Sequence, residues 1–495
     1  MRRAKIVATF GPAIASYENT LEVLKAGVDV ARMNMSHGDY TVHNATYENV
    51  RRAAASLGKP VGIMADLQGP KIRLGRFSDG PHALAVGDVF TITTEDVPGT
   101  KDICSTTLKS LPEDVKVGDA LLIDDGKVSL RATAVDDVKV VTEVVVGGMV
   151  SNNKGINLPG VAVNVPALST KDEDDLRWAL KRGVDLVALS FVRDAADINR
   201  VHAIMDEEGR RVPVIAKIEK PQAVEHLSEI IDAFDAIMVA RGDLGVELPL
   251  EEVPIVQKRA IELARRWAKP VIVATQVLES MIDNPRPTRA EASDCANAVL
   301  DGADAVMLSG ETSVGKYPIE TVKVMARIIE STEVHGLERV PALGTQPKTR
   351  GGAITRAAVT IADQLDAKYI CTFTQSGDSA RRLSRLRPVK PVFAFTPEEH
   401  VWNQLAMTWG IQPILVPMVA HTDAMIEQVD RTLLEKSLVV DGDMVVIAAG
   451  SPPGQAGSTN TLKVHKVGDL ADFTKVDGTR ANKEKVGPWP VSDGR

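Results

Sequence analysis

The sequence is poor in cysteine, in aromatic residues and in positive charge. It has three cysteines among 495 residues, Cys104, Cys295 and Cys371. This odd, widely spaced set fits neither a disulfide framework nor a zinc site and predicts a cytoplasmic protein. Aromatic residues make up only 4%, so Val, Ala, Ile and Leu must fill the cores, as in buried parallel strands covered by helices. The net charge of −8 lacks the basic excess typical of nucleic-acid-binding proteins.

Long hydrophobic runs are also absent. No run reaches the length of a membrane helix, so no membrane partner is expected. The basic and then apolar start, residues 1–14, is interrupted by Gly11-Pro12 and lacks a small-residue cleavage site. We therefore interpret it as a first strand rather than a signal peptide. The polar, aperiodic segment 473–495 is predicted to be a disordered tail or an expression remnant.

Eight short, continuous apolar runs recur along the first two thirds of the chain. Most are separated by about 25–30 residues with a helical pattern, such as 250–268. Eight strand–helix units predict an α/β protein with a (β/α)8 TIM barrel. The predicted strands are 4–11, 28–36, 60–69, 184–191, 212–219, 235–243, 270–276 and 303–311.

Two further domains are predicted. Between the third and fourth strands lies a long, β-rich interval, which we interpret as a small β-barrel lid domain inserted over the barrel mouth. After about residue 345 a new strand–helix alternation predicts a C-terminal α/β regulatory domain. The predicted boundaries are 1–69 and 167–343 for the barrel, 70–166 for the lid, 344–472 for the C-terminal domain and 473–495 for the tail.

Polar and charged residues gather where the predicted barrel strands end. Strand ends also meet solvent, but solvent exposure alone does not explain the repeated carboxylates and cations. Active sites of such barrels lie at this edge. Lys217 and Glu219 are two residues apart on one strand and point to the same side. Together with Asp243, Glu219 could hold Mg²⁺, or Mn²⁺, which binds one or two carboxylates and completes its shell with substrate oxygens and water.

The alternative interpretation of these residues is a buried ion pair between Lys217 and Glu219 or Asp243. Arg32 and Arg73 add positive charge suited to phosphate. A cationic metal site without an obvious histidine base predicts a phosphorylated substrate and electrostatic catalysis. His37 is either a turn histidine or a nucleotide contact, and no Walker-type loop occurs.

Seven motifs in this order resemble the pyruvate kinase family over residues 1–470. They are RMNMSHG (32–38), DLQGPKIR (66–73), GINLPG (155–160), VIAKIEK (214–220), MVARGDLGVE (238–247), ATQVLESM (274–281) and MLSGETSVGKYP (307–318). The resemblance implies transfer of a phosphoryl group from phosphoenolpyruvate to ADP, giving pyruvate and ATP in glycolysis, and typically a homotetramer.

The resemblance also implies roles for individual residues. Glu219 and Asp243 match magnesium ligands, and Lys217 matches the residue that stabilises phosphoryl transfer and the enolate. Gly242, Asp243 and Thr275 match the cradle of the substrate carboxylate, and Thr275 is a candidate for helping to protonate the enolate. Arg32 and Arg73 match phosphate contacts. Nucleotide contacts are implied for Asn34, His37, Arg73 and Lys154, and potassium-binding positions for Asn34, Ser36 and Asp66.

Two departures from the family pattern lead to further predictions. Lys71 stands where potassium-dependent members have glutamate, and Leu67 where they have threonine. A covalently delivered ammonium carries the charge of a potassium ion, so Lys71 is predicted to make potassium unnecessary; its alternative is a solvent-facing hinge lysine.

The second departure concerns the phosphorylated effector that the family binds at the loop carrying Thr374, Ser376, Gly377 and Ser379. The alternative for this loop is an ordinary helix cap. The facing loop, 450–461, has no Arg, Lys or Trp for a second phosphate, so the predicted effector is AMP or a hexose monophosphate.

Two other functions stay open at this stage. A magnesium-dependent barrel lyase or aldolase acting through a pyruvate enolate would use similar residues, although the lid and the C-terminal domain argue against it. A catalytically silent metabolite sensor is disfavoured because Lys217, Glu219, Asp243 and Thr275 are intact.

Overall fold

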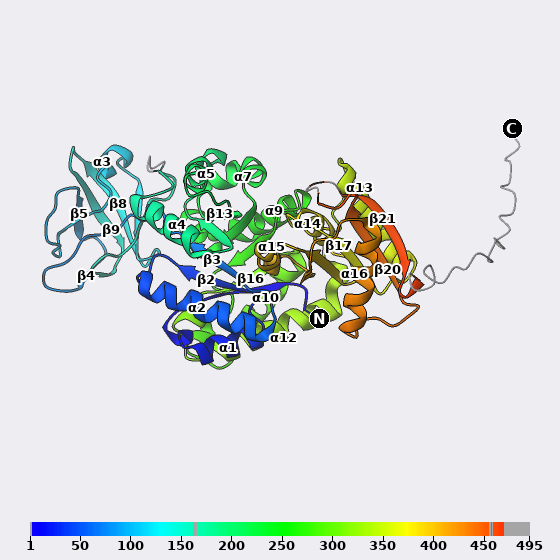
Figure 1. Cartoon of the computed structure of the whole chain (residues 1–495). Coiled ribbons are helices and arrows are strands. Elements are labelled where there is room, and N and C mark those ends of the chain that lie inside the picture. Colours follow the sequence, from blue (N-terminus) through cyan, green and yellow to red (C-terminus); the bar gives the residue numbers. More distant parts are fainter. Residues whose placement is uncertain (1, 162–165, 455–456, 458, 470–495) are drawn as a thin grey trace, which may run out of the picture.

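The computed structural model describes residues 2–161, 166–454, 457 and 459–469. Figure 1 shows an elongated molecule with the lid at one end, the barrel in the middle and the C-terminal domain at the opposite end. The predicted tail, 473–495, lies outside the described residues.

The barrel is closed by eight parallel strands in the order β1-β16-β15-β14-β13-β12-β3-β2. Each of the eight predicted apolar runs contains one of these strands, which confirms the TIM-barrel prediction. The continuous burial of the strands explains why their sequences do not alternate. The strands are β1 (Lys5–Thr9), β2 (Val30–Asn34), β3 (Gly62–Asp66), β12 (Leu186–Leu189), β13 (Val214–Ile218), β14 (Ala236–Ala240), β15 (Val271–Ala274) and β16 (Ala305–Leu308).

Helices pack around this barrel and bury its outer surface. Side chains such as Val7, Met64 and Met238 fill the interior, and Met407, from the C-terminal domain, joins them in the same cluster. The α-helices of this part are α1 (Tyr17–Ala26), α2 (Tyr40–Leu57), α4 (Thr170–Arg182), α5 (Ile198–Glu207), α6 (Pro221–Glu225), α7 (Leu227–Ala233), α8 (Arg241–Glu247), α9 (Val253–Arg266), α10 (Arg289–Asp301), α11 (Gly310–Ser313) and α12 (Pro318–Gly336). Short 3-10 helices are η1 (Pro12–Ile14), η2 (Ala195–Asp197), η3 (Leu250–Glu252), η4 (Glu279–Ile282) and η5 (Leu337–Arg339).

The lid is a curled six-stranded sheet in the order β11-β7-β8-β9-β5-β6, with a two-stranded sheet, β10-β4, beside it. It has a hydrophobic core of its own, which includes Phe90, Leu121 and Leu130. It is therefore an open form of the predicted small β-barrel. Its elements are β4 (His82–Leu84), β5 (Val89–Thr93), β6 (Ile103–Ser105), α3 (Leu111–Asp114), β7 (Ala120–Ile123), β8 (Val128–Val135), β9 (Lys139–Val146), β10 (Gly148–Val150) and β11 (Ile156–Asn157).

The C-terminal domain is a five-stranded sheet in the order β19-β18-β17-β20-β21, in which only β21 runs antiparallel. This confirms the predicted α/β domain. Its elements are α13 (Arg350–Gln364), β17 (Tyr369–Phe373), α14 (Asp378–Ser384), β18 (Val392–Thr396), α15 (Glu399–Gln404), η6 (Leu405–Met407), β19 (Ile411–Leu415), α16 (Thr422–Glu435), β20 (Met444–Gly450) and β21 (Thr459–Lys466).

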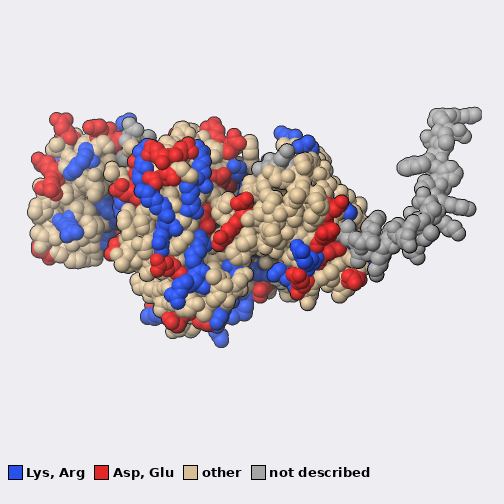
Figure 2. Space-filling view, viewed as in Figure 1, with Lys and Arg blue, Asp and Glu red and all other residues tan. Residues whose placement is uncertain are grey.

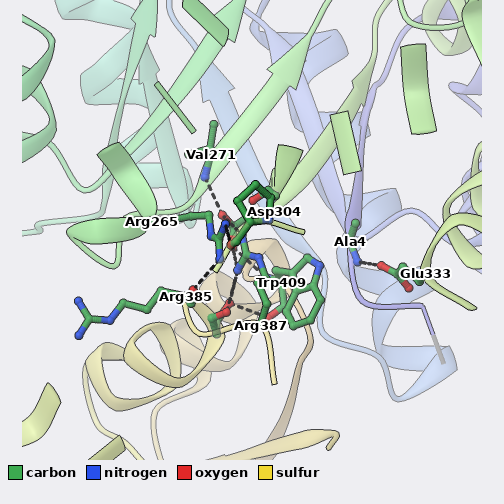
Figure 3. A network of polar contacts seen from close by, with 11 residues as sticks. Ala4, Arg265, Val271, Asp304, Glu333, Arg385, Arg387 and Trp409 are labelled. Atoms are coloured by element: carbon green, nitrogen blue, oxygen red, sulfur yellow. Dashed lines mark hydrogen bonds and ion pairs between the residues drawn. The ribbon is translucent and has the colours of Figure 1, made fainter. Parts of the chain in front are cut away.

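A buried polar network joins the barrel to the C-terminal domain (Figure 3). The Arg387 Nη2 lies 3.1 Å from the Asp304 Oδ2, and both side chains are about 95% buried. Asp304 also accepts hydrogen bonds from the amides of Val271 and Trp409, while the Arg387 guanidinium stacks over the Trp409 ring. The charges of Arg387 and Asp304 therefore compensate each other in this buried joint.

Figure 2 shows basic and acidic side chains interspersed over the barrel and the lid, whereas much of the C-terminal domain is uncharged in this view. Ion pairs such as Arg177 with Glu208 and Arg200 with Glu173 join helices α4 and α5. All three cysteines are buried and free. Within the described part of the chain, no helix is long and apolar enough to cross a membrane.

Candidate active site

The polar strand ends meet around a cavity of about 230 Å³ at the mouth of the barrel, between the strand ends and the lid. Side chains from β2, β3, β13, the segment after β12 and the first turn of α8 reach it, because the carboxyl ends of parallel strands share one edge. The structure thus brings together most of the predicted site. Its lining residues are Arg32, Asn34, Ser36, His37, Asp66, Leu67, Gln68, Lys71, Arg73, Ser190, Phe191, Lys217, Glu219 and Asp243.

Lys217 is the cation at the centre of this cavity. Its Nζ lies 2.7 Å from the Glu219 Oε1 and 3.5 Å from the Asp66 Oδ1, and it donates a hydrogen bond to the Ser190 Oγ at 2.8 Å. Burial opposes its positive charge, but the carboxylates of Asp66 and Glu219 outweigh burial and raise the pKa of Lys217 above its ordinary value. Lys217 is therefore a fixed ammonium rather than a proton-transfer group.

Glu219 and Asp243 fit a divalent ion. Glu219 is 1% exposed; burial, with the negative charge of Asp243, raises its pKa, although Lys217 opposes the shift. A divalent cation between the two carboxylates would relieve this repulsion, and hard oxygen donors suit Mg²⁺. Among the described residues, no group of three or more His, Cys, Asp or Glu side chains forms a metal site, so substrate and water would complete the coordination.

Arg32 and Asp66 form the second buried pair of the site. The Arg32 Nε lies 2.6 Å from the Asp66 Oδ2, and an Nη of Arg32 donates to the Thr9 Oγ1 at 2.8 Å. Burial disfavours ionised Asp66, but Lys217 and Arg32 outweigh it and lower the Asp66 pKa. Asp66 therefore holds both cations at the cavity in fixed positions.

Lys71 and Arg73 form a positive edge of the cavity beside the lid, and His37 lies next to them. Burial lowers the pKa of His37, and the charges of Arg73, Lys71 and Arg32 lower it further. A neutral imidazole near pH 7 offers a hydrogen bond rather than a charge. Arg73 donates to the Asn153 carbonyl of the lid at 2.9 Å.

Lys154 is not brought to this cavity. Its Nζ lies 2.9 Å from the Asp124 Oδ1 within the lid, and it is absent from the described residues that line the cavity.

The segment Arg241-Gly242-Asp243 is the first turn of helix α8. The Gly242 amide donates to the Thr275 Oγ1 at 2.7 Å. Arg241 points away from the cavity, because it pairs with Asp294 at 2.8 Å and donates to the Thr275 carbonyl. Gly242 and Thr275 therefore lie together, and Arg241 bonds to the Thr275 backbone, but neither Gly242 nor Thr275 is among the described residues that line the cavity.

Family models match most of the chain. The barrel domain of pyruvate kinase matches residues 1–322, and its alpha/beta domain matches residues 352–465. The chain belongs to the pyruvate kinase family. Its activity is pyruvate kinase activity, the phosphoryl transfer between phosphoenolpyruvate and ADP, and the family generally needs a divalent metal.

Individual pyruvate kinases are similar over nearly their whole length. The chain is 59% identical over 468 residues to the pyruvate kinase of Mycobacterium intracellulare, covering 94% of this chain and 99% of the relative. It is 59% identical over 475 residues to that of Corynebacterium glutamicum, covering 96% and 100%. The crystal structure of a pyruvate kinase from Cryptosporidium parvum superposes with a TM-score of 0.88 at 35% identity, covering 94% of this chain and 96% of that one.

Asn34, Ser36 and Asp66, the predicted monovalent-cation positions, line the cavity together with Lys71. Asp66 is neutralised by Arg32 and Lys217 rather than by Lys71. The Lys71 side chain lies against the lid at Gly155, where an added Cβ would come within 3.2 Å of the Lys71 Cε. Among the described residues its ammonium has no ion-pair partner, so its charge is directed at the cavity and its contents.

The predicted effector loop lies at the edge of a small pocket of about 50 Å³ in the C-terminal domain. Thr374, Ser376 and Ser379 line it, together with apolar side chains from β18 and α16. Gly377 begins α14 with φ of 81°, and its amide donates to the Thr374 Oγ1 at 2.9 Å. No side chain caps this helix, which disfavours the ordinary-cap alternative.

Two site residues were missed as functional candidates. Ser190 lies directly after β12, and its hydroxyl accepts from Lys217. Phe191 was not noted, yet its amide donates to the Glu219 Oε2 at 2.9 Å. A backbone amide leaves no trace in a sequence; the only available signal was the position of Ser190-Phe191 directly after a buried strand.

Proposed function

We propose that the cavity at the barrel mouth performs phosphoryl transfer with Lys217 as its central electrostatic group. The observation that carries this proposal is the fixed ammonium of Lys217 between Asp66 and Glu219. Positive charge held in place stabilises charge that develops on the transferring phosphoryl group and the enolate without reorganisation. Arg32 and Arg73 contact the phosphate, because guanidinium groups bind phosphate oxygens in a bidentate manner.

Glu219 and Asp243 hold Mg²⁺, or Mn²⁺, which when bound neutralises negative charge on the phosphate and the enolate oxygens. Gly242 and Thr275 cradle the substrate carboxylate, consistent with the hydrogen bond that joins them. Thr275 is the candidate group for helping to protonate the enolate, a role for which its hydroxyl must turn away from the Ala274 carbonyl to which it now donates.

Asn34, His37, Arg73 and Lys154 contact the nucleotide. The first three lie at the cavity edge. Lys154 reaches the nucleotide only if the lid approaches the barrel and the Asp124 pair opens, because it now lies within the lid. Lys71 replaces the monovalent cation that Asn34, Ser36 and Asp66 would otherwise help to bind, so potassium is not required.

Regulation and assembly complete the proposal. The loop with Thr374, Ser376, Gly377 and Ser379 binds the phosphate of AMP or of a hexose monophosphate. The enzyme works in the cytoplasm as a homotetramer, as the resemblance to the family implies. We also propose that the chain is divided at the boundaries predicted from the sequence, with the lid at 70–166 and the C-terminal domain at 344–472.

Lys217→Met tests the central role. We expect its turnover to fall by more than about 100-fold, the scale of losing one preorganised charge, while Mn²⁺ binding, measured by electron paramagnetic resonance, is kept. Glu219→Gln is the matched variant, which should lose Mn²⁺ binding as well. Pyruvate release from phosphoenolpyruvate should require ADP. Near-normal turnover of Lys217→Met would show that the role is wrong.

A further inference from the structure

The chain crosses between the barrel and the lid twice, and one buried carboxylate joins the first crossing to the start of α4, the helix that follows the second crossing. Asp172, in the first turn of α4, is 0% exposed. Its Oδ1 accepts a hydrogen bond from the Gly69 amide at 3.0 Å, where the chain leaves β3 for the lid. Its Oδ2 accepts from the amide and the hydroxyl of Ser169, at 2.9 and 2.6 Å, where the chain returns to the barrel.

Gly69 in turn presses against the Ser190-Phe191 dipeptide. Its φ is 73°, and a Cβ at this position would lie 2.5 Å from the Phe191 ring and 2.9 Å from the Ser190 Cβ. Phe191 has a φ of 56°, a left-handed conformation that costs energy for a bulky residue and that persists only where its surroundings impose it. The first crossing and the dipeptide therefore cannot move independently.

The same dipeptide holds two residues of the proposed catalytic centre. The Phe191 amide donates to the Glu219 Oε2 at 2.9 Å. The Ser190 hydroxyl accepts from the Lys217 Nζ at 2.8 Å and donates to the Leu67 carbonyl, two residues before Gly69, at 2.7 Å. Groups that orient a metal ligand in this way tune its position and basicity.

We propose that Asp172, Gly69, Ser190 and Phe191 form the pivot of the lid, and that they are positioning residues for phosphoryl transfer. Asp172 keeps Gly69 at a fixed distance from the start of α4, so that the lid moves as a body about Gly69. Movement at Gly69 is passed to Phe191 and Ser190 and hence to Glu219 and Lys217. The site becomes competent only when the lid is seated, which excludes water during the transfer. This inference rests on the proposed roles of Glu219 and Lys217.

The test compares Asp172→Ala with Ser169→Ala. Both variants remove helix-capping contacts of α4, but Ser169→Ala leaves the Asp172 bond to Gly69 in place. We expect kcat of Asp172→Ala to fall by about 10-fold or more, the scale of a misplaced reactive group, with smaller changes in both KM values. Ser169→Ala should keep kcat within about twofold of the unmodified enzyme, although both should melt at lower temperature.

The position of the lid is measured separately by double electron–electron resonance. The two spin labels are attached to cysteines that replace exposed residues, Val86 in the lid and Val42 on α2. The natural cysteines are buried, and dilution with unlabelled chain isolates distances within one chain. Asp172→Ala should broaden the distance distribution, and Ser169→Ala should not. The distance distribution does not depend on the roles of Glu219 and Lys217. If those roles are wrong, the distribution of Asp172→Ala still broadens; if the pivot is wrong, it does not.

Asp172→Asn is the control for general misfolding of the Asp172→Ala variant. It keeps an oxygen acceptor for the Gly69 amide and loses charge, so it should recover most of the kcat and the narrow distribution. The pivot is overturned if Asp172→Ala keeps its kcat or its narrow distribution, if Ser169→Ala loses as much, or if Asp172→Asn is as impaired as Asp172→Ala.

Discussion

The Arg32 Nε lies 2.6 Å from the Asp66 Oδ2, and both residues are at least 90% buried at the mouth of the barrel. Asp66 also faces Lys217 at 3.5 Å. One carboxylate therefore compensates two buried cations. Removing one member of such a cluster leaves uncompensated charge in a site with little water.

Asp66→Asn should therefore lower the free energy of unfolding by about 3–5 kcal/mol, the range for breaking a buried pair. Urea denaturation at pH 7 measures this loss. Asp124→Asn, which removes a more exposed carboxylate in the lid beside Lys154 and Lys127, is the control and should cost at most about 1 kcal/mol. An equal loss of unfolding free energy in the two variants would show that Asp66 does not compensate buried charge.

The same carboxylate predicts a pH dependence. The Asp66 pKa is lowered, since Lys217 and Arg32 outweigh burial. The stabilisation from ionised Asp66 is therefore complete above the unfolded-state pKa of about 4 and is lost as the pH falls through the lower folded-state pKa. The difference in unfolding free energy between the unmodified chain and Asp66→Asn should shrink below about pH 4. A difference that stays constant there would argue against a lowered pKa.

Potassium dependence should follow the residue at position 71. We expect the unmodified enzyme to keep its activity in potassium-free buffer with tetramethylammonium at constant ionic strength, because the Lys71 ammonium supplies the charge. Lys71→Glu, alone or with Leu67→Thr, should create or increase a response to potassium in steady-state assays. Lys71→Gln is the control that removes the ammonium without adding a carboxylate. An unmodified enzyme that is inactive until potassium is added would exclude this role of Lys71.

Activation should be specific for monophosphates. AMP or a hexose monophosphate should lower the KM for phosphoenolpyruvate, because the loop 450–461 has no cation for a second phosphate. Ser376→Asp places a negative charge on the pocket lining and should abolish this activation while sparing basal activity, with Ser376→Ala as the uncharged control. Strong activation by fructose 1,6-bisphosphate, with no response to monophosphates, would refute the prediction.

The buried pair between Arg387 and Asp304, which joins the barrel to the C-terminal domain, should contribute to the free energy of unfolding. Arg387→Met leaves Asp304 buried without its cation and should lower the unfolding free energy by about 3–5 kcal/mol in chemical denaturation. Lys316→Met, at an exposed pair with Asp283, is the control, for which about 0–1 kcal/mol is expected. A loss at Arg387 no larger than that of the control would show that the pair contributes little to the joint.

Local patterns in the sequence determined the elements and much of the site. Continuous apolar runs mark the eight barrel strands because parallel strands are buried on both faces. Lys217 and Glu219 were placed on one side by the two-residue period of a strand, and their 2.7 Å contact confirms it. Glycine and proline at residues 69–70 marked the start of the lid, since such residues interrupt regular structure.

Only the tertiary structure decided which groups meet across the chain. Asp172 and Gly69 are 103 residues apart, and the bond between them depends on how the lid is inserted into the barrel. Phe191 orients Glu219 through a backbone amide, which carries no residue-specific signal. The sequence could not predict that Arg32 and Lys217 are the partners of Asp66. Three strand ends converge there, and any of several cations was suitable. Sequence spacing fixes neighbours along one strand or helix, whereas closure of the barrel fixes neighbours between strands.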